Sequence, residues 1–353
     1  MHLPATFWML LAGCALVYAL LWWVVLGAGR AARRRALDTR IRLWESTHTP
    51  PSAATLQALR GAALAARRAL CAQTDRQRLY GQPWVLFVGD PAADLLSLLA
   101  AAHPAGPVQA QAADAGEGFW RWWLMARMAA IEVCPPPMAP TQPQDALWLR
   151  ALRELALLRP RLPLNGVALC VSVGALQADG SVARPIIELL CRRVNDTVRG
   201  LRVQLPVYVI VTGLQRLPGH AAVQAALPAE ALAHALGCRV SEEADAPDAY
   251  ALDRLFHPLV LRLQALRLGL LREATEAPQR ADIHAFVEAV QGLEPGLALL
   301  MERLGHAGHT DGGRQAAPLR GLYFTASGTQ SAFVGDLFQR FMPEDQGLAR
   351  PRP

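Results

Sequence analysis

One stretch of the chain has the outline of a phosphate-binding loop. An apolar run at 85–88 is followed by Gly89 and, after a short connection, by a second apolar run that begins at Leu95. This order predicts a buried strand, a turn and a helix, which is the layout of the nucleotide-binding pattern G-x-x-x-x-G-K-[ST]. In that pattern, backbone N–H groups and a lysine hold phosphates, and a hydroxyl holds Mg²⁺. The chemistry to consider first is therefore nucleotide binding.

The residues at the chemical positions of this loop are of the wrong type. Gly89 stands at the first glycine, but Asp94 stands at the second glycine, Leu95 at the lysine and Leu96 at the hydroxyl. The chain contains no lysine, so all 35 of its Lys+Arg residues are arginine. We interpret the four positions as a vestigial loop and expect no cofactor, no metal and no catalytic residue. Asp94 is expected to cap the helix that follows it, in place of the lost anion.

The apolar runs around this loop predict an α/β fold. Strands are expected at 85–88, 128–133, 167–173, 207–211 and 321–325, and most of them are continuous apolar runs, as in strands covered on both faces. Helical patterns alternate with these runs, which predicts a mostly parallel, P-loop-NTPase-like sheet with right-handed crossovers, flanking helices and a helical C-terminal part.

The N-terminal residues predict a membrane anchor. Phe7–Leu26 is uncharged and apolar, and at about 1.5 Å per residue it is long enough to cross a hydrocarbon core of about 30 Å. The positive charges follow this run, whereas those of a cleaved signal peptide precede it. A single uncleaved transmembrane helix is therefore expected, with the N-terminus outside the cytoplasm and the rest of the chain inside it. The following arginines are expected to meet anionic lipid headgroups; they are Arg30, Arg33, Arg34 and Arg35.

Composition divides the chain into five expected parts. They are an anchor (1–29), basic juxtamembrane helices (30–79), a degenerate P-loop NTPase-like domain (80–250), a helical part that closes with a strand (251–342) and a flexible tail (343–353). Much of the net charge of +6 lies in the juxtamembrane segment, so it does not indicate a nucleic-acid partner. The tryptophans at 120, 122 and 123 could stack on bases, but packing is favoured because no basic groove accompanies them.

The six cysteines have no C-x-x-C spacing. Free, mostly buried thiols are therefore favoured over disulfides or a zinc site.

Three blocks of the sequence, at 159–167, 206–219 and 319–325, resemble signatures of one family, the type VI secretion inner-membrane component IcmF/TssM. Arg159–Val167 resembles its R-P-R-x-P-[IL]-N-G-V signature. Pro206–Thr212 and Leu217–Gly219 are similar to its P-V-Y-x-x-x-T-K-x-D-x-x-P-G block, and Leu319–Thr325 is similar to its L-R-G-x-Y-F-T-S block. The resemblance covers roughly residues 80–342. It implies the family's cytoplasmic NTPase-like domain, a bacterial inner-membrane location, and partners among other inner-membrane and baseplate subunits.

The departures from the family pattern concern the expected chemistry. The segment after Trp122 and Trp123 resembles the family's W-W-x₈-D-T-A-G, yet Glu132 holds the acidic position and Pro135 the switch glycine. Where the family has the base-reading motif T-K-x-D, this chain has Thr-Gly-Leu-Gln at residues 212–215. These two departures and the altered loop after Gly89 are three independent losses. Together they predict a non-catalytic, membrane-anchored scaffold. A divergent ATPase or GTPase, which supplies energy or a switch for secretion, remains the alternative. A truncated gene product without function is the third.

Overall fold

The computed structural model describes residues 5–73, 80–103, 105–108, 118–134, 143–240, 252–306, 318–327 and 331–351. Pro135, at the predicted switch glycine, lies outside these residues. The last part of the helix expected after residue 55 also lies outside them.

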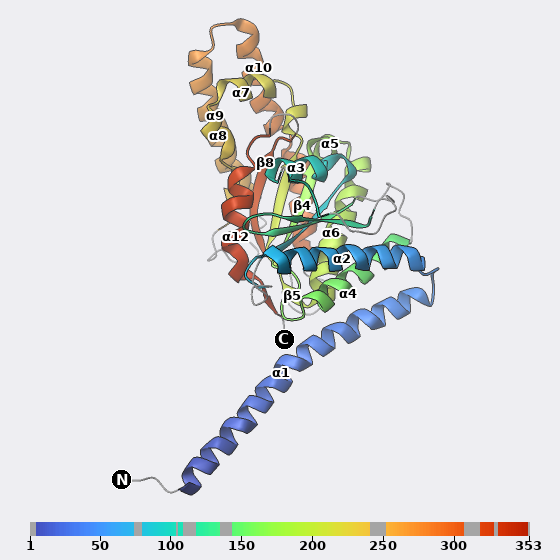
Figure 1. The fold of residues 1–353 in the computed structure, drawn as a ribbon. Helices are drawn as coiled ribbons and strands as arrows, with labels where there is room; N and C mark the ends of the chain where they lie inside the picture. The colour runs from blue at the N-terminus through green and yellow to red at the C-terminus, as the bar shows by residue number, and fades with distance from the viewer. Residues whose placement is uncertain are drawn as a thin grey trace.

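A seven-stranded sheet runs through the described part of the domain in the order β2-β3-β1-β4-β6-β8-β7 (Figure 1). The strands are β1 (Trp84–Gly89), β2 (Trp120–Leu124), β3 (Ala129–Val133), β4 (Gly166–Ser172), β6 (Val207–Thr212), β7 (Leu236–Arg239) and β8 (Leu319–Thr325). The five central strands are parallel, which confirms the predicted mostly parallel α/β sheet. The antiparallel edge strands β2 and β7 were not predicted. Strand β3 pairs with one side of β1, and the next strand in the chain, β4, pairs with the other side. The strand order therefore reverses at β1, and open α/β sheets bind ligands at such a reversal.

The two faces of the sheet are covered unequally. Alternate residues of each strand point to opposite faces, so in β1 Leu86 joins one buried cluster and Phe87 the other. The smaller cluster lies under α3 (Leu95–Ala102) and a C-terminal helical segment, which consists of a π-helix (Leu337–Phe341) and α12 (Met342–Glu344).

The larger cluster takes in most of the remaining helices. They are α2 (Ala53–Gln73), α4 (Pro143–Leu158), α5 (Val173–Gln177), α6 (Gly180–Leu201), α7 (His220–Ala226), α9 (Leu252–Glu273), α10 (Ala277–Gln291) and α11 (Glu294–His306). Helix α8 (Ala229–Ala233) lies between α7 and β7. Helices α9 and α10 extend beyond the sheet, away from the end at which the C-terminus lies (Figure 1).

Helix α1 (Ala5–Glu45) is one continuous helix, although the sequence predicted an anchor and a separate basic helix. Its second half packs against α4 and α6, with Leu37 fully buried. Ion pairs fix this contact, including Arg40 with Asp196 at 2.7 Å. The first half projects away from the domain (Figure 1). Within the described part of the chain, no helix is both long and apolar enough to span a bilayer, so the predicted anchor at 7–26 is not supported.

Residues 343–351, expected as part of a flexible tail, are packed against the domain. Asp345 is 3% exposed. The last described residues form β9 (Arg350–Pro351), which pairs with β5 (Val203–Gln204). The strand β9 forms only because it pairs with β5, which lies nearly 150 residues earlier in the chain. The local sequence therefore contains no signal for it.

Candidate functional site

The loop after β1 occupies the position of a phosphate-binding loop, but side chains of the domain fill it. A 3₁₀ turn (Pro91–Ala93) connects the strand to α3. A Cβ atom built on Gly89 would lie 3.2 Å from the Cβ atoms of Ala93 and Cys170. Leu95, at the lysine position, is buried, whereas Leu96, at the hydroxyl position, is 46% exposed. No side chain at the four predicted positions can neutralise a phosphate.

Asp94 caps α3 as predicted. Its carboxylate accepts a hydrogen bond from the backbone N–H of Ser97 at 3.2 Å. Its backbone is left-handed, with φ of 47°, a conformation that aspartate and asparagine tolerate better than most residues. The cap satisfies one free N–H group at the helix start.

Asp90 is the carboxylate that closes the loop, and the sequence analysis missed it. It is 4% exposed. Its Oδ2 atom accepts from the backbone N–H of Ser172 at 2.7 Å, and Oδ1 accepts from the Ser172 hydroxyl at 3.0 Å and from the Ala92 N–H at 2.9 Å. Asp90 directly follows β1 and Ser172 ends β4, so their shared position at the carboxyl ends of neighbouring strands was the available signal. The result is an internal anion that ties the two strand ends together.

Glu132, at the acidic position of the family pattern, is enclosed by β2. Its Oε2 atom accepts from the Trp123 indole at 2.9 Å, and its Oε1 atom lies 3.4 Å from Arg121. Burial raises the pKa of Glu132, although the Trp123 hydrogen bond and then Arg121 act to lower it. The tryptophans at 120, 122 and 123 are at most 3% exposed, so packing is confirmed for them. Among the residues that the structure describes, no group of three or more His, Cys, Asp or Glu could hold a metal.

The base-reading position is also taken up by contacts within the domain. Leu214 is fully buried, and Gly213 has a φ of 90°. Gln215, where the family pattern has an aspartate, accepts a hydrogen bond from the Ser327 N–H through its side-chain oxygen at 3.2 Å. The loop after β6 is thus bound to the loop after β8.

The described cysteines form no disulfide, as expected, and all six are free. Only Cys170, Cys191 and Cys238 are buried, so the expectation that most would be buried holds for half of them.

The signature block at 159–167 lies at the opposite end of the sheet, where the parallel strands begin. We call this end the amino edge. The fully buried Arg159 donates from Nη1 to Asn165 Oδ1 at 2.6 Å and from Nη2 to the Gln82 carbonyl at 3.2 Å. Its guanidinium also lies over the rings of Tyr80 and Trp84, 4.8 and 5.0 Å from their centroids. Burial lowers the pKa of Arg159 to about 10, so the side chain remains a cation at neutral pH.

Asn165 extends this contact to the C-terminal segment. It accepts from the Trp84 backbone N–H at 3.0 Å and donates to the Gln346 carbonyl at 3.1 Å. The Gln346 amide in turn donates to the Tyr80 carbonyl at 2.7 Å. The starts of β1 and β4 and the C-terminal turn are therefore joined by side chains of one signature block.

The other two blocks meet at Asp345. Its carboxylate accepts from the Tyr208 hydroxyl at 3.0 Å, from Arg320 at 3.0 and 3.1 Å, and from Arg239. Burial raises the pKa of Tyr208, and the nearby carboxylate adds to this, so the hydroxyl keeps its proton. We refer to Arg159, Asn165, Tyr208, Arg320 and Asp345 together as the amino-edge cluster.

Comparison with protein families assigns the chain. Residues 141–353, more than half of its length, match the IcmF-related N-terminal domain. The chain belongs to the IcmF-related family. The matched residues include the whole amino-edge cluster but not the loop after β1.

A similar relative is the type VI secretion system component TssM1 of Pseudomonas aeruginosa. It is 26% identical over 325 residues, which cover 86% of this chain. The IcmF-related chain spans only 29% of the length of that relative. No solved structure matches the chain.

The expected lipid contacts of this IcmF-related chain need a correction at Arg33. Arg33 is 3% exposed, and its guanidinium donates to the Pro160 carbonyl, next to Arg159, at 3.0 Å. A buried side chain cannot face lipid, so Arg33 joins α1 to the amino edge instead. Arg34 and Arg35 are exposed, and the side chain of Arg30 lies outside the description.

Proposed function

We propose that this IcmF-related chain is a non-catalytic structural subunit of a type VI secretion system. The similarity to a component of that name supports the assignment to the system. The partners implied are other inner-membrane and baseplate subunits of the same machinery. Nucleic acid is not among them.

The observation that carries the non-catalytic proposal is the position of Asp90. Backbone N–H groups of the loop after the strand and of the following helix N-terminus are the donors that hold phosphates in this class of fold. Here the N–H of Ala92, in that loop, binds the Asp90 carboxylate, which also accepts from the N–H of Ser172. A bound phosphate would meet this negative charge, and the chain has no lysine to offset it.

Two further observations support the same proposal. Glu132 is buried against Trp123 and Arg121, and burial disfavours the charged form that a metal would need. Gln215 replaces the carboxylate of the base-reading pattern and bonds within the domain. Each of the three parts of a nucleotide site is therefore occupied by an internal contact.

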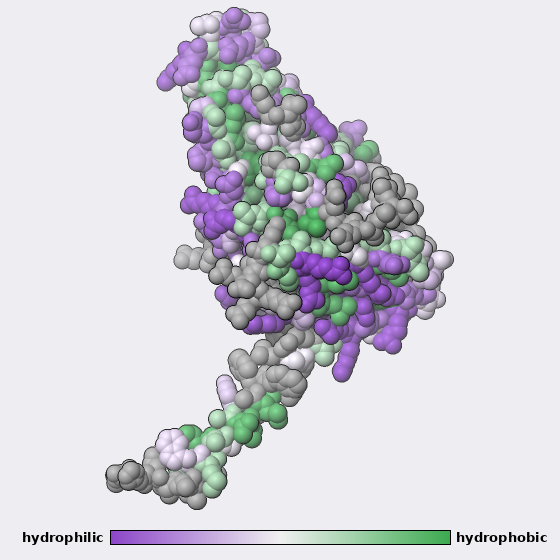
Figure 2. Space-filling model, in the orientation of Figure 1, coloured by the Kyte–Doolittle hydropathy of each residue, from purple (hydrophilic) through white to green (hydrophobic). Residues whose placement is uncertain are grey.

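The proposal includes association with the inner membrane through the first half of α1. Apolar side chains on this projecting half are exposed, including Trp8 at 58%, Leu16 at 72% and Leu20 at 65% (Figure 2). Such a surface has no protein covering it, and a bilayer would remove it from water. Arg34 and Arg35 follow it and are available to anionic headgroups. In this arrangement the α/β domain lies on the cytoplasmic side.

Titration calorimetry tests whether the chain binds nucleotides, as a catalytic subunit would. The full chain in detergent should bind Mg²⁺-ATP and Mg²⁺-GTP no more tightly than about 1 mM, or about −4 kcal/mol. In parallel, affinity purification from solubilised membranes should recover other secretion-system subunits. A micromolar, Mg²⁺-dependent isotherm would support the divergent ATPase or GTPase instead.

A further inference from the structure

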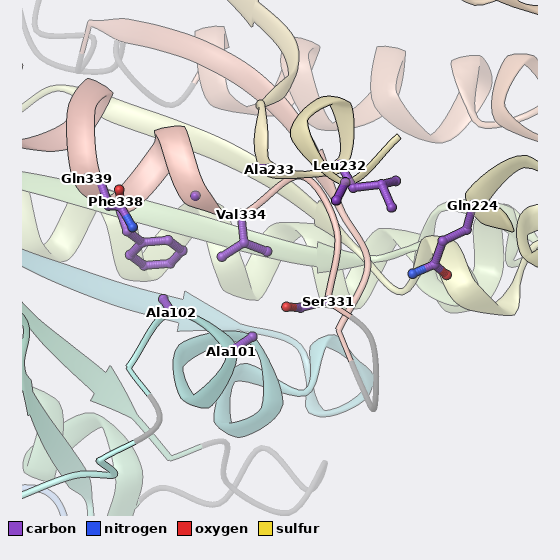
Figure 3. A pocket seen from close by; sticks show the side chains of 11 residues that line it. Ala101, Ala102, Gln224, Leu232, Ala233, Ser331, Val334, Phe338 and Gln339 are labelled. Atoms are coloured by element: carbon purple, nitrogen blue, oxygen red, sulfur yellow. The ribbon is translucent and has the colours of Figure 1, made fainter. Parts of the chain in front are cut away.

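A cavity of about 620 Å³ opens on the thinly covered face of the sheet. It lies between α3, the α7–α8 region and residues 331–339 of the C-terminal segment. Figure 3 shows Val334 and Phe338 on one side, with Ala101 and Ala102 of α3 facing them. The volume falls in the range of small-molecule sites, about 300–1,000 Å³.

The chemistry of the cavity wall is uncharged. Most of the described residues that line it are alanine, leucine, valine or phenylalanine, and none of these described residues is ionisable, although polar atoms share the wall's surface with apolar ones. The polar groups come from Gln224, Ser331 and Gln339. Amide and hydroxyl groups can donate and accept hydrogen bonds, but none of them can balance a net charge. An ionised ligand would lose hydration here without a counter-charge, which disfavours it.

The backbone along one wall is held in unusual conformations. Phe333 has a φ of 65°, which is rare for a bulky residue. A π-helix (Leu337–Phe341) follows it, and π-helical turns are frequent at functional sites. A Cβ atom on Gly335 would lie 2.8 Å from the Ala233 carbonyl, so α8 and this segment approach closely only because residue 335 is glycine. The left-handed backbone of Phe333 costs stability. Phe333 directly precedes the lining residue Val334, and Gly335 and two residues of the π-helix line the cavity themselves.

The wall also has a rigid support beneath it. The Phe338 ring stacks on Phe87 of β1 with ring centroids 5.6 Å apart. The cavity wall thus rests on β1, the strand where the sheet order reverses, and it shares no residue with the vestigial loop. We propose that it binds one uncharged small molecule, which the three polar side chains orient. This site is separate from the proposed structural function and does not depend on it.

Photolabelling with a matched pair of probes tests the site. The uncharged probe is 3-trifluoromethyl-3-phenyldiazirine, and its 4-carboxylate carries one negative charge on the same scaffold. Each is titrated against the full chain in detergent, and labelled peptides are quantified by mass spectrometry. The neutral probe should label peptides 95–103 and 331–341 saturably. Its half-saturating concentration should be about tenfold lower than that of the carboxylate, because the cavity cannot pair a charge.

Cavity-filling variants make the result specific to this place. Ala102→Trp and Ala233→Phe enter the cavity from opposite sides and should each reduce labelling of both peptides about fivefold or more. Ala225→Phe, at an exposed α7 position outside the cavity, is the control and should change nothing. Labelling of the exposed first half of α1 serves as the internal standard, and circular dichroism verifies folding. Linear uptake without saturation, equal affinity for both probes, or labelling that the filling variants leave unchanged would overturn the proposal.

Discussion

At the scale of single residues, the loop after β1 contains two aspartates with different tasks. Asp94 is exposed and caps α3, as the sequence indicated, because a cap depends on neighbouring residues alone. Asp90 is buried and binds Ser172, which lies 82 positions further along the chain. A sequence pattern identifies the first task and not the second, since the second depends on how β1 and β4 pair. Asp94 thus caps the helix as predicted, and Asp90 is a second internal carboxylate that was not predicted.

The two aspartates predict different costs for the same substitution. Asp90→Asn should lower the free energy of unfolding by about 2 kcal/mol, because charge-assisted bonds are lost and a buried N–H is left poorly satisfied. Asp94→Asn keeps an acceptor and tolerates the left-handed backbone, so it should cost only about 0.3–1 kcal/mol. Chemical denaturation of both variants at low salt measures the difference. Equal midpoints for the two variants would contradict the role given to Asp90.

At the scale of elements, the central strands could be predicted and the edges could not. Continuous apolar runs identify β1, β4, β6 and β8 because both of their faces are buried. Strand β7 is short and contains Gly237, where a Cβ atom would lie 2.2 Å from the Leu322 carbonyl. Its close pairing with β8 therefore depends on the absence of a side chain rather than on an apolar pattern.

The contact between α10 and the loop before α7 gives a test at this scale. Gly219 has a φ of 74°, and a Cβ atom there would lie 1.8 Å from the Asp282 carbonyl. Gly219→Ala should destabilise the protein by about 3 kcal/mol or more, since it adds backbone strain and a clash between backbones. Gly269→Ala, on α9 with open space around it, is the control and should be neutral or stabilising by up to about 1 kcal/mol. Thermal and urea unfolding distinguish the two, and similar curves would argue against this packing.

At the scale of the whole molecule, the family signatures lie far from the place where chemistry was expected. Three blocks separated in sequence meet in the amino-edge cluster and hold the C-terminal turn. The sequence showed that these residues belong together as a pattern but not where they meet. Long-range ion pairs have no periodicity, so only the assembled fold brings Asp345 to Arg320 and Tyr208.

The amino-edge cluster predicts that Asp345 controls the C-terminal segment. Asp345→Asn removes the buried carboxylate that the buried Arg320 and the more exposed Arg239 share, and should cost about 3–5 kcal/mol. Hydrogen exchange of the β5–β9 pair should rise as the turn loosens. The neighbouring Glu344→Gln is the control, because its ion pairs are largely exposed and worth about 1 kcal/mol or less. If exchange in β5 and β9 is unchanged by Asp345→Asn, the cluster does not anchor this segment.

The docking of α1 has a mechanical consequence. A pull on its projecting half would enter the domain through Arg33, which bonds to Pro160 beside Arg159, and through the Arg40–Asp196 pair on α6. From Pro160 the load would pass to Arg159 and Asn165 and on to the C-terminal turn. This route stays at one end of the sheet. The loop after β1 lies at the other end, sheltered from tension that the helix transmits.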